Sequence, residues 1–118
     1  MKYEEAREQM LVVSYVQNKY PDVLFTSALG GSKASSIQEA VRRKKLGYRR
    51  SWPDLTILFP AGGFHGLLIE LKKTGGKCDD PDQIVFLLAA DKLGYKAVCC
   101  IGYKVAIKTI DAYMKLGR

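Results

Sequence analysis

Histidine and cysteine are both scarce in this sequence. His65 is the only histidine, and the cysteines are Cys78, Cys99 and Cys100. A lone histidine gives little support to a histidine-dependent mechanism, and three cysteines of which two are adjacent lack the paired spacing of a zinc site. We therefore expect His65 to be a surface residue and the cysteines to be reduced thiols, with Cys99 and Cys100 in the core.

Long apolar runs are also missing. No stretch of the sequence reaches the roughly 18 to 20 apolar residues that a membrane-spanning helix needs, and residues 1–5 are too polar for a secretory signal. The chain has 118 residues, of which 47% are hydrophobic, which suffices for one globular domain with a core. We expect a single domain over residues 1–118, located in the cytoplasm and not bound to a membrane.

Acidic residues are fewer than basic ones, which leaves a net charge of +7 and a pI near 9.4. Such an excess attracts a polyanion, and nucleic acid is the first partner to consider. Much of the excess lies in one basic cluster, which comprises Arg42, Arg43, Lys44, Lys45, Arg49 and Arg50. Basic runs are also common on solvated helix faces, so charge alone does not decide the partner.

Hydrophobic spacing and turn residues divide the chain into alternating elements. They predict helices over residues 3–19, 35–46, 81–93 and 105–116, and strands over residues 23–28, 54–59, 64–73 and 97–101. We expect the first helix to bury Met10, Val13, Val16 and Tyr20, Asp80 to cap the third helix, and the last strand to be covered on both faces. A hairpin followed by a helical crossover to another strand predicts an α/β fold, a mixed sheet flanked by helices.

The predicted hairpin carries three polar residues at one end. Asp54 begins its first strand, and Glu70 and Lys72 lie near the end of its second, so antiparallel pairing brings all three together. Side chains alternate along a strand, which places Glu70 and Lys72 on one face and directs Leu71 into the core. A carboxylate at the end of the apolar run 66–69 requires a counter-ion.

The oxygen ligands of Asp54 and Glu70 suit Mg²⁺ or Mn²⁺, and the backbone carbonyl of Leu71 can add another ligand. Lys72 would then orient or help to deprotonate the attacking water, or stabilise charge on a phosphate. The alternative is an ordinary ladder of Glu70 and Lys72 on the surface, with Asp54 as a turn residue after Pro53.

The full pattern is Pro53-Asp54, fifteen intervening residues with a turn, and then Glu70-Leu71-Lys72. This pattern resembles the PD-(D/E)XK nuclease motif. The likeness to one family of that superfamily, the virus-type replication-repair nucleases (VRR-NUC), extends over nearly the whole chain. It rests on Glu5 and Gln9, residues 51–55, residues 66–72, Gln83, and residues 93–97 before an apolar strand.

The resemblance implies a restriction-endonuclease-like fold, divalent-metal dependence with Mg²⁺ or Mn²⁺, and a DNA phosphodiester substrate. Likeness to the stand-alone viral members implies a homodimer that acts on branched DNA such as Holliday junctions, located in the host cytoplasm if the protein is viral. Intact Asp54, Glu70 and Lys72 argue against the alternative function, a non-catalytic or partner-dependent nucleic-acid-binding module of a replication or repair complex.

The resemblance also assigns roles to residues that the pattern alone leaves open. Glu5, with Glu8 as the alternative, would join the metal site from the first helix, although acids in a first helical turn also favour the helix dipole. Gln83 would hydrogen-bond to Lys72, the water or a phosphate. The family often has glycine just ahead of the Pro-Asp pair, whereas this chain has Ser51 and Trp52 there. Either stacking on DNA or packing would explain Trp52.

The same likeness favours phosphate contacts for the basic cluster. The glycine-rich loop 27–33 is either a connector or a mobile segment that contacts DNA. The spacing in this loop does not match a phosphate-binding loop.

Overall fold

The centre of the protein is a mixed β-sheet. The computed structural model describes residues 3–28 and 34–117, and in this part of the chain four strands form one sheet in the order β1-β2-β3-β4. The strands are β1 Phe25–Ser27, β2 Leu55–Ile57, β3 Leu67–Lys72 and β4 Lys96–Ile101. β2 runs antiparallel to both β1 and β3, whereas β4 is parallel to β3. This confirms the predicted hairpin and the predicted α/β class.

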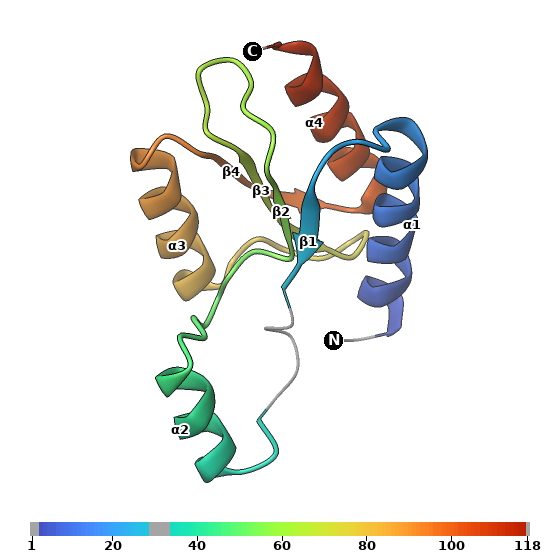
Figure 1. The fold of residues 1–118 in the computed structure, drawn as a ribbon. Helices are drawn as coiled ribbons and strands as arrows, with labels where there is room; N and C mark the ends of the chain where they lie inside the picture. The colour runs from blue at the N-terminus through green and yellow to red at the C-terminus, as the bar shows by residue number, and fades with distance from the viewer. Residues whose placement is uncertain (1–2, 29–33, 118) are drawn as a thin grey trace.

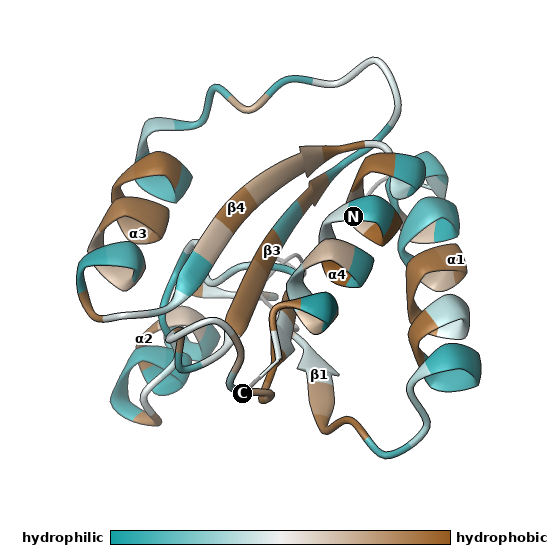
Figure 2. Cartoon of the chain, turned by 90° about the horizontal axis from the view of Figure 1, so that it is seen from above, coloured by the Kyte–Doolittle hydropathy of each residue, from teal (hydrophilic) through white to brown (hydrophobic). Residues whose placement is uncertain are grey.

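Helices cover both faces of the sheet. They are α1 Tyr3–Lys19, α2 Ile37–Lys45, α3 Pro81–Lys92 and α4 Tyr103–Lys115. α1 and α4 pack together on one face, and α3 lies on the other (Figure 1). Figure 2 shows the apolar strands β3 and β4 between these two layers. Among the described helices, none is both long and apolar enough to cross a membrane.

The core lies mainly between the sheet and the pair formed by α1 and α4. Leu55, Ile57, Leu67 and Ile69 are almost completely buried, as are Val12 and Val16 of α1 and Ile110 and Tyr113 of α4. Each such aliphatic side chain contributes about 1.5–3 kcal/mol by leaving water. The helix that follows β1 is different, since no residue of α2 is buried, and α2 stands apart from the sheet (Figure 1).

The apolar stripe of α1 differs from the prediction. Val12 and Val16 are buried together with Glu8, whereas Met10 is 68% exposed. Val13 and Tyr20 lie at the border of the core. The helical spacing is correct, but the buried face is turned toward Glu8 because this acid finds its hydrogen-bond donors inside the protein.

Side-chain caps fix the starts of two helices. Ser36 accepts a hydrogen bond from the Glu39 N–H at the start of α2. Asp80 accepts from the N–H groups of Asp82 and Gln83, and Pro81 occupies the first turn of α3. The cap at Asp80 is the one expected from the sequence, and each such cap contributes about 1 kcal/mol.

The prediction for the cysteines is wrong at two positions. Cys78 and Cys99 form a disulfide that joins the loop before α3 to β4, and only Cys100 is a free, buried thiol among the described cysteines. Neighbouring residues of a strand point to opposite faces, so the pair 99–100 cannot lie in one core. Cys100 faces α4, and Cys99 faces the other layer.

β4 also departs from its expected environment. It is one of the two edge strands, and most of its residues are half-buried rather than enclosed on both faces. The continuous apolar run was therefore not a sign of a central strand, because α3 shields its outer face only in part. His65 is exposed, as expected, and its ring contacts Tyr95.

Candidate active site

The hairpin brings Asp54, Glu70 and Lys72 together. Leu55 pairs with Ile69, so Asp54 and Glu70 occupy the next positions at the end of the antiparallel ladder. The two carboxyl groups lie in hydrogen-bond contact with each other. Lys72 Nζ lies 3.4 Å from Glu70 Oε2. The sequence pattern therefore corresponds to one compact cluster in space.

The residue between Glu70 and Lys72 holds the Asp54 carboxylate in place. The Leu71 N–H donates a hydrogen bond to Asp54 Oδ2 at 2.7 Å, while the Leu71 side chain is buried in the core. In an extended strand the N–H and C=O of one residue face the same neighbour. The Leu71 carbonyl therefore lies on the strand edge that faces Asp54. This is the position in which the sequence analysis expects it to serve as a metal ligand.

Gln83 joins this cluster from the other side. Its Nε2 donates to Glu70 Oε2 at 2.6 Å. Asp80 caps the helix by accepting from the Gln83 N–H, which fixes the first turn of α3 and with it the direction of the side chain. The observed partner is Glu70, whereas the sequence analysis expected Lys72, the water or a phosphate. We refer to Asp54, Glu70, Lys72 and Gln83 as the catalytic group, because catalysis is the role that the sequence analysis expects of them.

Burial makes ionisation of the two acids costly. It raises the pKa of Glu70 to about 7, and the neighbouring Asp54 carboxylate adds to this shift, although Lys72 opposes it. Burial also raises the pKa of Asp54, against the opposing effect of the hydrogen bond from Leu71. The pair lacks enough positive charge for both members to be ionised comfortably at neutral pH.

This donor set fits a divalent cation. Mg²⁺ commonly takes only one or two protein carboxylates and completes its shell with water and substrate oxygens. Asp54, Glu70 and the Leu71 carbonyl supply such ligands. In the part of the chain that the structure describes, no three His, Cys, Asp or Glu side chains group closely enough to hold a metal ion. Glu5 is therefore not brought into the pair as a third close ligand.

The acids of α1 have separate positions. Glu5 is half-buried and near enough to raise the pKa of Asp54 by charge repulsion. Glu8 instead accepts hydrogen bonds from the N–H and hydroxyl of Thr74, both at 2.7 Å, and from the Tyr103 N–H at 3.0 Å. Of the two alternatives, Glu5 faces the candidate site, and Glu8 connects α1 to the loop after β3 and to α4.

A further feature of α1 is the side-chain amide oxygen of Gln9. Its buried Oε1 has no hydrogen-bond partner among the described residues. Gln9 follows Glu5 by four residues, so both side chains share one face of α1. A buried acceptor without a donor costs free energy, which a water or a ligand on this face would relieve.

The segment before Asp54 has an unusual backbone. Ser51 has φ 65°, in the left-handed region that glycine prefers. The local turn that a nearby glycine would favour is therefore formed here by serine. Trp52 donates from Nε1 to Thr56 Oγ1, and its ring packs edge-on against Phe86 of α3.

Sequence reasoning missed Phe86 as a neighbour of this site, because it reads as an ordinary apolar residue of a helix. The available signal was its spacing. Phe86 follows Gln83 by three residues and therefore shares the face of α3 that carries Gln83.

The basic cluster lies on α2 and on the segment that leads to Trp52. Five of its members are exposed, and Arg43 is half-buried. Arg42 and Arg43 both form ion pairs with Glu39. Residues 29–33 of the glycine-rich loop lie outside the described residues, so the two interpretations of that loop stay as predictions.

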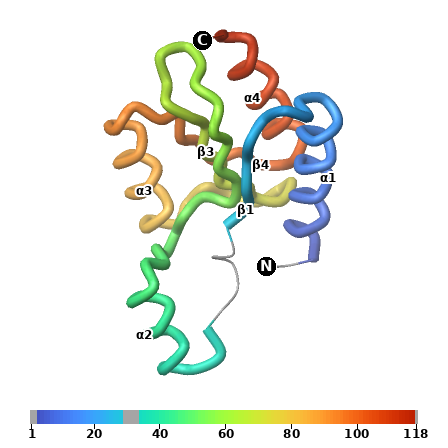
Figure 3. Tube along the Cα trace, viewed as in Figure 1, coloured from blue at the N-terminus to red at the C-terminus, as the bar shows by residue number. Residues whose placement is uncertain are grey.

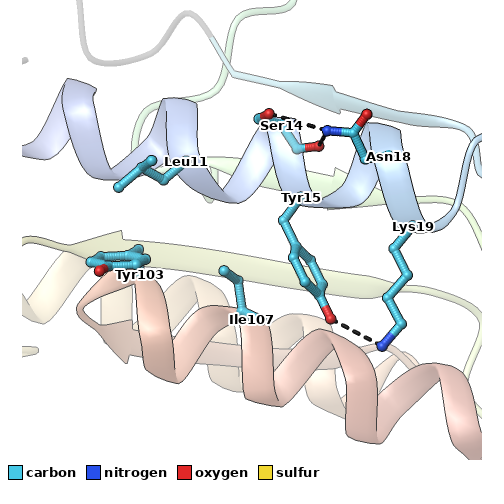
Figure 4. Close-up of a pocket in the computed structure, with 7 residues that line it drawn as sticks. All are labelled: Leu11, Ser14, Tyr15, Asn18, Lys19, Tyr103 and Ile107. Carbon is cyan, nitrogen blue, oxygen red and sulfur yellow. Dashed lines mark hydrogen bonds between the residues drawn. The ribbon is translucent and has the colours of Figure 1, made fainter.

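A pocket of about 450 Å³ lies elsewhere, between α1 and α4. Leu11, Tyr15, Tyr103 and Ile107 line it (Figure 4). Asp111 accepts hydrogen bonds from Tyr15 and Tyr20 beside this pocket, which fastens the two helices together. No member of the catalytic group lines the pocket, and we assign it no part in the candidate site.

Comparison with known proteins identifies one informative relative. A solved structure described as a VRR_NUC domain protein superposes with a TM-score of 0.83 and 28% sequence identity, covering 99% of this chain and 93% of that chain. No family model matches the sequence, and no curated protein matches it. The fold is therefore restriction-endonuclease-like. The chain thus shares its fold with a VRR_NUC domain protein, and its motif Pro53-Asp54, Glu70-Leu71-Lys72 forms one cluster in space, which supports the resemblance to the VRR-NUC family.

Proposed function

We propose that this protein is a divalent-metal-dependent endonuclease that hydrolyses DNA phosphodiester bonds. The observation that carries the proposal is the buried pair of Asp54 and Glu70, two carboxyls with raised pKa beside the single cation of Lys72. Such a pair gains most from a bound Mg²⁺ or Mn²⁺, and a strongly perturbed acid next to a basic surface is typical of a catalytic site.

Each member of the catalytic group has a definite task in this proposal. A bound Mg²⁺ or Mn²⁺ would supply Lewis-acid stabilisation of phosphate charge and lower the pKa of a water. Asp54 and Glu70 would hold the cation, and Leu71 would add its carbonyl. Gln83 fixes Glu70 through its amide, and Lys72 orients the water or offsets charge on the phosphate.

The surface supports a DNA substrate. The basic cluster follows α2 and the segment that leads to Asp54, so it presents positive charge along the approach to the catalytic group. Contacts from these residues to phosphates would position DNA without reading its sequence. In accordance with the family resemblance, we propose branched DNA such as a Holliday junction as the preferred form.

We further propose that the protein acts as a homodimer, because symmetric cutting of two strands requires two active sites. α2 is the surface that favours this. Ile37 and Val41 lie one turn apart on it and are 82% and 48% exposed, and no described helix or strand packs closely against α2. The ends of α1 and α4 also expose apolar residues, but these helices are already packed on the sheet.

A cleavage experiment tests the function. Labelled four-way junction, flap, duplex and single-stranded DNA are incubated with Mg²⁺, Mn²⁺ or EDTA, using the wild-type protein and the variants Asp54→Ala and Lys72→Ala. We expect metal-dependent cutting, fastest on the junction, that disappears in both variants. If folded wild type binds DNA but cuts none of the four, the alternative of a binding module or a partner-dependent subunit replaces our proposal.

A further inference from the structure

Three side chains beside the catalytic group form an aromatic and cationic cluster. The rings of Trp52 and Phe86 lie 5.0 Å apart at 66°, an edge-to-face contact. The Arg49 guanidinium lies over the Phe86 ring at 5.5 Å from its centroid. We call Arg49, Trp52 and Phe86 the aromatic cluster. None of its members has a part in the hydrolysis described above.

Trp52 is held firmly and yet exposed. The hydrogen bond from its Nε1 to Thr56 Oγ1 is 3.0 Å long, and the neighbouring Pro53 is buried. Phe86 supports one part of the ring. Nevertheless 43% of Trp52 remains accessible. A rigid aromatic ring with free surface loses little conformational entropy when a planar ligand stacks on it.

The cluster adjoins the reacting centre along two separate elements. Trp52 precedes Asp54 by two residues, and Phe86 follows Gln83 by three on the same face of α3. Figure 3 shows the chain rising from α2 past the start of α3 before it enters β2. The left-handed backbone at Ser51 directs this segment toward α3, and strained residues of this kind are frequent next to functional sites.

We propose that Trp52, supported by Phe86 and flanked by Arg49, is a stacking platform for an unpaired base of the DNA next to the bond that is cut. The inference rests on the proposed function and deepens it. Bases within a duplex already stack on their neighbours, whereas a base at a branch point or in a single strand offers a free face. The arginine supplies the positive charge that the adjoining phosphate requires.

Because Trp52 is the only tryptophan, its fluorescence reports on the platform directly. The experiment titrates the protein, in EDTA so that nothing is cut, with a duplex that carries one unpaired 2-aminopurine. The probe for comparison is the same duplex with that base paired. We expect quenching of both the Trp52 and the 2-aminopurine emission with the unpaired probe only.

Two variants and a matched control complete the test. Trp52→Leu should lose the 2-aminopurine quenching and bind the unpaired probe roughly tenfold more weakly, whereas Trp52→Phe should retain most of both. Tyr48→Leu removes another exposed aromatic ring of the same segment and should change neither.

The outcomes separate this inference from the proposed function. If fluorescence polarisation shows binding of the unpaired probe while the Trp52 emission stays constant, the platform is refuted and the nuclease proposal stands. If Trp52→Leu quenches 2-aminopurine as wild type does, the platform is refuted as well. If wild type binds neither probe, the platform is refuted, and the cleavage experiment alone decides the nuclease proposal.

Discussion

The ionised carboxylate of Glu70, which the proposed metal site needs, is costly for the stability of the fold. It is buried beside a second acid, and its pKa lies near 7 rather than at its ordinary value of 4.5. The folded protein therefore retains a proton between pH 4.5 and 7 that the unfolded chain has released. Since the folded state binds more protons in this window, its stability falls as pH rises through it.

Replacement of this acid should therefore stabilise the protein above neutral pH. We expect Glu70→Gln to unfold at the same or slightly higher temperature than wild type at pH 4.5, and at clearly higher temperature at pH 8, because it removes the charge that burial penalises. Thermal unfolding in EDTA at both pH values measures this. Identical pH profiles for the two proteins would show that Glu70 is not perturbed by its surroundings.

Glu8 and Glu4 are two acids of one helix with opposite importance for folding. Glu8 is buried and accepts three hydrogen bonds, which keep its pKa low although burial would raise it. Within residues 3–28 and 34–117, the side chain of Glu4 forms only an exposed ion pair with Lys73. We expect Glu8→Gln to lower the free energy of unfolding by about 2 kcal/mol at pH 7 and Glu4→Gln by less than 1 kcal/mol.

Urea denaturation of the two variants provides the comparison. The difference should shrink as pH falls below about 4.5, because the depressed pKa of Glu8 stabilises the fold only where the carboxyl is ionised. Equal losses for the two variants would contradict a structural role for Glu8.

At the scale of elements, the loop between β3 and α3 is held at both ends of its path. Thr74 contacts Glu8, and Cys78 is joined to Cys99 of β4. Cys99 is the pairing partner of Glu70 on the adjacent strand β3. The disulfide closes a loop of sequence separation 21. Reducing it should lower the free energy of unfolding by about 2–4 kcal/mol, because the reduced chain gains conformational entropy when unfolded.

Denaturation with and without a dithiol reductant measures this contribution. Cys78→Ser supplies the control, since it should resemble reduced wild type and should not respond to reductant. A reductant effect of the same size in Cys78→Ser would attribute the change to something other than the disulfide.

Elements with local signals were predicted well from the sequence, and features that depend on register were not. The cap at Asp80 and the hairpin before Glu70 have short-range causes, and both occur where expected. The side of α1 that is buried depends on donors from Thr74 and Tyr103, far away in sequence. Likewise, Cys78 meets Cys99 only through the parallel pairing of β3 with β4.

The candidate site was predictable for the same reason. Asp54, Glu70 and Lys72 belong to one hairpin, so strand alternation and antiparallel pairing suffice to bring them together. The contact between Trp52 and Phe86 needed the docking of α3 against the segment before β2. The spacing of Phe86 from Gln83 indicates a shared helix face, but it does not show which residue before β2 that docking brings to Phe86.

At the scale of the whole molecule, the dimer that we propose uses α2 as the contact between its two copies. Val41 on α2 and Val105 on α4 are both 48% exposed, which makes them a matched pair. We expect Val41→Glu to convert a dimer into a monomer in sedimentation analysis, because it places a charge in an apolar contact, and Val105→Glu to leave the dimer intact. Loss of the dimer in Val105→Glu alone would move the contact to α4.

The catalytic group itself is tested most directly by the rate of Mg²⁺-dependent junction cleavage under single-turnover conditions. The comparison uses wild type, Glu70→Gln and the exposed control Asp91→Asn, each shown to be folded. Our account predicts that Glu70→Gln is slower by about 100-fold or more while Asp91→Asn cuts at the wild-type rate. Wild-type rates in Glu70→Gln would contradict it, since the buried pair would then have no part in the chemistry.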